Sequence, residues 1–236
     1  MPRPDGRSAE ELRPLAFERG ANPYAEGSCL VRFGGTLVNC TASVEEGVPP
    51  FKKGSGEGWV TAEYAMLPRA TVERTSRERQ GPSGRSHEIQ RLIGRSLRAA
   101  MATMQFGEYT IRIDCDVLQA DGGTRTAAIT GGCVALVDAC EWIARRTGAA
   151  SPFGALVAAV SVGVIEQEVR LDLVYAEDRD AEVDANIVMR APGEFVEVQG
   201  TAEAGTYSRE QLDRLVDTAH RGILHLFTAQ RRALGW

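Results

Sequence analysis

Alternating apolar and polar positions predict several β-strands in the first half of the chain. The alternation runs through residues 27–33 and 36–44, which are separated by Gly34-Gly35, a dipeptide that favours a hairpin turn. The same period of two predicts further strands at residues 59–67 and 110–117. Because successive side chains of a strand point to opposite faces of a sheet, we expect these strands to bury one face.

Apolar residues spaced by three and four positions predict two helices between and after these strands. One stripe begins after Ser86, and a second runs from about Ala127 to Arg146. The first consists of Ile89, Leu92, Ile93, Leu97, Ala100, Met101 and Met104, and the second of Ile129, Cys133, Leu136, Val137, Cys140 and Ile143. The second helix is apolar enough to be central to the core.

The second half of the chain repeats this order of elements. Residues 156–165 are nearly all apolar, as in a strand covered on both faces, and residues 169–175 alternate as its hairpin partner. Two more strands are predicted at residues 185–189 and 195–199, and the capping box Ser208-Arg-Glu-Gln211 opens a last helix. Strand-rich blocks that are each closed by helices predict an α+β fold with helices packed on a mixed sheet.

Composition is typical of a globular protein without a membrane partner. The chain has 236 residues, of which 43% are hydrophobic and 25% are charged, sufficient for a sizeable core. No apolar run approaches the roughly 20 residues of a membrane helix. The first residues lack the apolar core of a signal peptide, so we expect a cytoplasmic protein. Five scattered cysteines without a C-x-x-C pair favour a structural role over zinc binding.

Charge is distributed unevenly along the chain. The net charge of −5 argues against indiscriminate binding of nucleic acid. Residues 69–98 nevertheless contain eight arginines and three glutamates. A basic patch on an acidic protein indicates a localised binding site for a polyanion. The alternative interpretation is a solvated, arginine-rich helix and loop.

The junction between the strand at 110–117 and the second helix has the features of an anion site. Gly122 and Gly123 allow a sharp turn, and Thr124, Arg125 and Thr126 follow where the helix is predicted to begin. The free amides and partial positive charge of a helix N-terminus stabilise an anion such as phosphate. Arg125 adds a planar set of donors that matches phosphate oxygens. The alternative is an ordinary capped helix that follows a tight turn.

Carboxylates are dense in the stretch after Tyr175. Five of them lie between Glu177 and Asp184, separating two predicted strands. Clustered carboxylates suit a divalent cation such as Mg²⁺ or Mn²⁺, and they also supply a general acid whose pKa is raised by its neighbours. We select Asp178 and Asp184 as the functional pair, with a solvated acidic loop as the alternative.

Longer motifs resemble the ribonuclease PH family of phosphate-dependent exoribonucleases. The matching stretches span nearly the whole chain in order, at residues 3–7, 40–51, 62–71, 88–95, 114–126 and 182–186. The resemblance implies an enzyme that shortens the 3′ end of tRNA precursors and other RNAs. Inorganic phosphate would be the co-substrate and nucleoside diphosphates the products of a reversible reaction.

The resemblance also assigns roles to residues. It implies phosphate binding by Arg85, Gly123, Thr124 and Arg125, and tRNA contacts by Arg69, Arg74 and Arg77. Asp178 and Asp184 fall on the two aspartates implicated in binding Mg²⁺ (or Mn²⁺) and in catalysis. Phosphate would then attack the last phosphodiester in line, and Asp178 would protonate the departing 3′ oxygen.

The architecture implied by the resemblance is that of the second domain of ribosomal protein S5, with two β-β-α-type halves. Residues 1–236 would form a single catalytic domain, and the protein would assemble as a homohexameric ring, a trimer of dimers. Two alternatives remain open at this point: a non-catalytic, RNA-binding ring subunit, and a metal-dependent hydrolytic nuclease. The presence of both the phosphate-binding residues and the aspartates favours the phosphorolytic enzyme.

Overall fold

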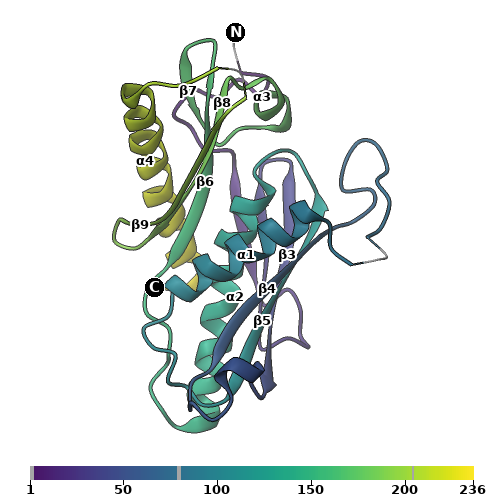
Figure 1. Cartoon of the computed structure of the whole chain (residues 1–236), viewed down its shortest axis with the longest axis vertical. Coiled ribbons are helices and arrows are strands. Elements are labelled where there is room, and N and C mark those ends of the chain that lie inside the picture. Colours follow the sequence, from purple (N-terminus) through teal and green to yellow (C-terminus); the bar gives the residue numbers. More distant parts are fainter. Residues whose placement is uncertain (1–2, 79–80, 204) are drawn as a thin grey trace.

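The computed structural model describes residues 3–78, 81–203 and 205–236, and these residues form two β-sheets with helices packed on them (Figure 1). The first sheet has the strand order β1-β2-β3-β5-β4. Its strands are β1 (Leu15–Arg19), β2 (Gly27–Phe33), β3 (Thr36–Glu46), β4 (Trp59–Met66) and β5 (Tyr109–Gln119). β4 runs parallel to β5 and the other pairs are antiparallel, which confirms the mixed sheet. β1 was not predicted from the sequence.

The second sheet is antiparallel throughout and has the order β7-β6-β8-β9. Its strands are β6 (Val157–Ile165), β7 (Glu168–Leu171), β8 (Val183–Arg190) and β9 (Glu194–Ala202). The prediction of a strand up to Tyr175 was wrong. β7 ends at Leu171 because Asp172 adopts a left-handed backbone conformation with φ of 55°, and the short helix α3 (Tyr175–Asp180) follows.

The longer helices begin and end at recognisable signals. α1 (Gly84–Ala99) begins where the Ser83 side chain accepts a hydrogen bond from the amide of Ser86. It ends before Met101 and Met104, so the prediction that these residues extend its stripe was wrong. α4 (Arg209–Leu234) has the predicted capping box, with Ser208 and Gln211 bonded reciprocally.

Helix α2 (Thr124–Thr147) is the centre of the core. It contacts β2, β3 and β5 of the first sheet and β6 of the second. By length and composition it is apolar enough to cross a membrane, contrary to the expectation from run length alone. However, 78% of its most apolar window is buried inside the protein, as in the core helix of a globular domain. The two sheets are therefore joined through a helix that both of them cover.

The cysteines are structural, as predicted. All five are free and buried. Burial raises the pKa of both Cys29 and Cys133 to about 12, so neither thiol ionises near neutral pH.

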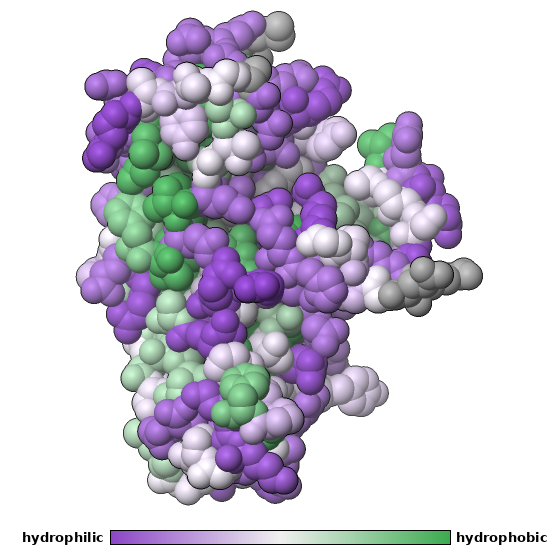
Figure 2. All heavy atoms as spheres, in the orientation of Figure 1, coloured by the Kyte–Doolittle hydropathy of each residue, from purple (hydrophilic) through white to green (hydrophobic). Residues whose placement is uncertain are grey.

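Residues 67–78, which follow β4 and which we call the projecting segment, extend from the body of the protein and have a mostly hydrophilic surface (Figures 1 and 2). This segment carries Arg69, Arg74 and Arg77, whose side chains are all exposed. Arg79, a further arginine of the predicted basic window, lies outside the described residues. The arginine-rich stretch is therefore presented away from the core.

Candidate active site

The turn that precedes α2, which we call the glycine turn (residues 121–124), has the conformation of an anion site. Gly122 and Gly123 have φ of 73° and 62°, a region that disfavours residues with a side chain. Gly123 is the N-cap of α2 and offers no side chain to bond the first amides of the helix. These amides, which have no partner within the helix, are therefore left for a ligand. α2 begins at Thr124, which confirms the prediction that Thr124, Arg125 and Thr126 stand at a helix start, whereas the apolar stripe from about Ala127 places that start three residues late.

Neighbouring elements hold the polar side chains of the glycine turn. The Tyr64 hydroxyl of β4 lies 2.8 Å from the Thr124 hydroxyl. Arg125 donates through Nη1 to Glu88 of α1 and to Gln199 of β9, each at 3.3 Å. Because Arg125 is bonded from two elements, its guanidinium is oriented before any ligand arrives.

A cavity of about 640 Å³, the central cavity, joins the predicted phosphate and acidic residues. Arg85 reaches it from the first turn of α1. Its lining includes Arg85, Gly123, Thr124, Arg125, Asp178 and Asp184. Residues nearly 100 positions apart in the sequence thus meet around one space. The size of the cavity suits a small anion together with the end of a nucleotide chain.

The two selected aspartates lie in different surroundings. Asp178 belongs to α3 and reaches solvent, whereas Asp184 belongs to β8 and has a buried Oδ1 with no hydrogen-bond partner among the described residues. Partial loss of water raises the pKa of Asp178, and the charge of Asp184 raises it further. Arg125 and Arg85 oppose this rise but do not cancel it. Asp178 therefore keeps its proton to a higher pH than an ordinary aspartate does.

The other carboxylates of the acidic segment (residues 172–184) do not join this pair, so the idea of one dense acidic loop needs correction. Glu177 is buried and bonds Arg3 and Arg170. Asp180 is exposed and bonds Arg179, while Glu182 accepts from Gln167. Among the described residues there is no group of three or more His, Cys, Asp or Glu side chains that could hold a metal ion. Any cation here would rest on two carboxylates and further oxygen ligands.

The predicted RNA-binding arginines lie beside the central cavity rather than in it. Arg69 and Arg74 are not part of its lining. Arg77 lines a neighbouring cavity of about 540 Å³, which Arg85 also lines. The projecting segment therefore flanks the central cavity on the side where Arg85 lies.

Several lining residues were missed by the sequence reasoning. Ser161 of β6 is buried within an apolar strand, and no local pattern marks it as functional. Asn186 belongs to a motif that was quoted for the family but was not assigned a role. Tyr175 and Glu203 also line the cavity, and only the packing of the second sheet shows this.

Two family models match the chain. Residues 11–140 match domain 1 of the 3′ exoribonuclease family, and residues 155–222 match domain 2. A curated ribonuclease PH of Synechococcus sp. (strain JA-2-3B'a(2-13)) is 57% identical over 236 residues, covering 98% of this chain and 97% of that protein. A ribonuclease PH of Corynebacterium glutamicum (strain R) is 57% identical over 234 residues, covering 98% of this chain and 96% of that protein.

Solved structures share the fold at lower identity. Rice (Oryza sativa) Rrp46 superposes with a TM-score of 0.80 at 21% identity, covering 98% of this chain and 100% of that one. A chain of the Archaeoglobus fulgidus exosome with RNA bound to the active site superposes with a TM-score of 0.81 at 20% identity, covering 95% of this chain and 91% of that one. These likenesses concern the fold, and they confirm the predicted α+β class.

Proposed function

The chain belongs to the 3′ exoribonuclease family, as a ribonuclease PH. We propose that two sides of its central cavity have different roles in the phosphorolysis of an RNA 3′ end, one formed by the glycine turn and the other by the acidic segment. The chain is a phosphate-dependent 3′-to-5′ exoribonuclease, and it has the fold of the second domain of ribosomal protein S5. This proposal is supported by one observation, that the same cavity is lined by Arg85, Arg125, Asp178 and Asp184.

Inorganic phosphate binds on the side of the glycine turn. The free amides at the start of α2, the Thr124 hydroxyl and the guanidinium groups of Arg85 and Arg125 surround this side with donors. A phosphate there is stabilised by the helix dipole and by charge-assisted hydrogen bonds. The bound anion faces the acidic side of the same cavity, where the terminal phosphodiester enters.

The acidic segment supplies the proton that the departing 3′ oxygen needs. A phosphate oxygen forms a bond to the terminal phosphorus, and the bond from phosphorus to the 3′ oxygen of the penultimate nucleotide breaks. The departing oxygen needs a proton, and Asp178 supplies it because its pKa is raised in this site. The products are a nucleoside diphosphate and an RNA shortened by one nucleotide. In reverse, the Asp178 carboxylate accepts the proton and the nucleotide is added.

A divalent cation fits the acidic side. Asp184 has a buried carboxylate oxygen without a partner among the described residues, and a hard cation prefers oxygen ligands. Asp178 and Asp184 would hold Mg²⁺ (or Mn²⁺), and Asn186 lines the same cavity. When bound, the ion neutralises part of the charge on the transferring phosphoryl group.

The projecting segment binds the RNA body. Arg69, Arg74 and Arg77 are exposed and beside the cavity, so they are placed to contact phosphates of a tRNA precursor whose 3′ end is in the site. The resemblance to the family supports tRNA precursors and other RNA 3′ ends as substrates in the cytoplasm. It also supports assembly into a homohexameric ring.

Residues 1–236 act as one catalytic domain in this proposal, because both sheets line the central cavity. A non-catalytic, RNA-binding ring subunit is the alternative function. The convergence of the phosphate-binding arginines and both aspartates on one cavity favours catalysis over that alternative. A hydrolytic nuclease would not need the phosphate side.

The test is to incubate a tRNA that carries extra 3′ nucleotides with the protein and Mg²⁺, with and without inorganic phosphate. We expect nucleoside diphosphates only when phosphate is present. Monophosphates without phosphate would indicate a hydrolase, and RNA binding without product in either tube would favour the ring subunit. Asp184→Asn should abolish product formation while leaving RNA binding intact.

A further inference from the structure

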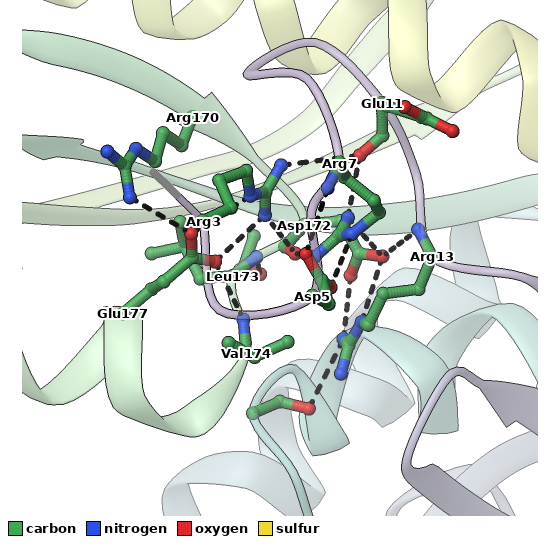
Figure 3. A network of polar contacts seen from close by, with 12 residues as sticks. Arg3, Asp5, Arg7, Glu11, Arg13, Arg170, Asp172, Leu173, Val174 and Glu177 are labelled. Atoms are coloured by element: carbon green, nitrogen blue, oxygen red, sulfur yellow. Dashed lines mark hydrogen bonds and ion pairs between the residues drawn. The ribbon is translucent and has the colours of Figure 1, made fainter. Parts of the chain in front are cut away.

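An N-terminal segment (residues 3–13) lies across the acidic segment and buries its arginines there (Figure 3). Arg3 and Arg13 are 6% and 3% exposed, although buried arginines are uncommon unless they are paired. Neither residue lines the central cavity. Their partners are the residues that connect the two sides of the site.

Arg13 contacts both sides of the site with one guanidinium group. Its Nε and Nη2 donate to the two carboxylate oxygens of Asp172, at 3.0 and 2.7 Å. Its Nη1 donates to the carbonyl of Asp121 at 2.5 Å, and Nη2 also reaches the carbonyl of Gly122 at 3.4 Å. Asp172 opens the acidic segment, while Asp121 and Gly122 belong to the glycine turn. The planar fork of Arg13 therefore sets the spacing between them.

The backbone of Asp172 needs this support. Its φ of 55° is unfavourable for a residue with a side chain and persists only where the surroundings determine it. The main-chain amide of Arg13 bonds the Asp172 carboxylate at 2.9 Å, and Arg3 and Arg7 each donate to the Asp172 carbonyl at 3.0 Å. The N-terminal segment thus fixes the point at which the chain leaves β7 for the helix that carries Asp178.

The two sides also touch directly, so a change in one displaces the other. The Tyr175 amide donates to the Asp121 carboxylate at 3.2 Å. A Cβ at Gly122 would lie 2.4 Å from the Leu173 carbonyl oxygen, which shows how closely the backbones pack. Arg13 bonds the carbonyls of Asp121 and Gly122 on one side of this contact, and on the other side the carboxylate of Asp172, the residue before Leu173.

We propose that Arg13 is a positioning residue that sets the phosphate-binding turn against the aspartate side of the active site through its bonds to Asp172 and to the glycine turn. Arg13 does not line the central cavity, so its effect passes through the geometry of these two segments. The proposal rests on the proposed function of the glycine turn in holding phosphate.

The test is Arg13→Lys, which keeps the charge but cannot bond both Asp172 oxygens and the two turn carbonyls at once. We expect the phosphate KM to rise about tenfold and kcat to fall by a similar factor, because small misplacements of reacting groups slow catalysis strongly. The Kd for tRNA, measured without phosphate, should stay unchanged, since the exposed arginines of the projecting segment are untouched.

The matched control is Arg19→Lys. Arg19 also bonds a carboxylate, Asp138, and a backbone carbonyl, that of Leu234 at 3.2 Å, but it lies away from the central cavity. Equal kinetic losses in both variants, or unchanged phosphate KM and kcat in Arg13→Lys, would overturn the proposal. If Arg13→Lys does not fold, Asp172→Asn tests the same pair, because the amide keeps one acceptor oxygen for Arg13.

Measurements on the parent protein, which has no substitution, distinguish failure of this proposal from failure of the proposed function. If the parent releases no diphosphates from RNA with phosphate, the proposed function fails on its own. Calorimetric titration of inorganic phosphate into the parent and both lysine variants still tests Arg13. Phosphate binding that is weakened about tenfold in Arg13→Lys alone supports positioning, and equal binding in all three proteins refutes it.

Discussion

Replacing Gly122 by alanine tests whether the contact between the glycine turn and the acidic segment controls activity. Gly122 has φ of 73°, and a side chain there costs about 1–2 kcal/mol in a left-handed conformation. The new Cβ would also lie 2.4 Å from the Leu173 carbonyl oxygen and 2.8 Å from the Val174 carbonyl carbon. Both atoms belong to backbone, so the two segments must separate by roughly 1 Å to restore ordinary contact.

A displacement of that size at the phosphate side is expected to lower kcat/KM for phosphate about 100-fold. The control is Gly148→Ala, at the C-cap of α2. Gly148 has nearly the same φ, 71°, but nothing lies within 4 Å of the added Cβ. The Gly148→Ala variant should lose the same 1–2 kcal/mol of stability, or about 2–8 °C in Tm for a chain of this size, and keep its activity.

The assay combines initial rates of diphosphate release over a range of phosphate concentrations with urea unfolding of each variant. The difference in unfolding free energy between Gly122→Ala and Gly148→Ala measures the steric part alone. Full activity in Gly122→Ala would refute the reasoning. So would an equal fractional loss in both variants, because the cause would then be backbone strain rather than the position of the turn.

Three further predictions concern individual side chains. Asp178→Asn should lower kcat about 100-fold or more in single-turnover assays, and a loss below about tenfold would exclude it as the general acid. Burial alone would raise the pKa of Glu177, but hydrogen bonds from Arg3 and Arg170 hold it below 4.5. The charged Glu177 carboxylate stabilises the fold fully above the pKa that it has in the unfolded chain, and this stabilisation is lost as pH falls through its lower pKa in the folded protein. In urea unfolding, Glu177→Gln should therefore lower the free energy of unfolding by about 3 kcal/mol at pH 7, and the stability of the variant should depend less on pH in acid. Arg74→Ala should reduce the salt dependence of RNA binding by about 0.7 in log–log slope, and an unchanged slope would exclude a phosphate contact.

Local signals were sufficient for much of the fold. The hairpin at Gly34-Gly35, the capping box at Ser208 and the alternation in β5 each depend on residues within a few positions of one another. β1 was missed because its five residues have little pattern of their own and form a strand only by pairing with β2. The predicted end of β7 failed because the backbone of Asp172 is set by arginines at the start of the chain.

The sequence by itself determined the conformation of the glycine turn and predicted an anion site there, since two glycines, a threonine and an arginine at a helix start act within one turn of backbone. It also identified Asp178 and Asp184 as candidates, but not how their neighbours differ. Only the tertiary structure decided that Glu177 is a buried partner of Arg3 while Asp178, the next residue, lines the cavity. The physical reason is that the ionisation and role of a carboxylate depend on burial and on partner charges, which folding brings from distant positions in the chain.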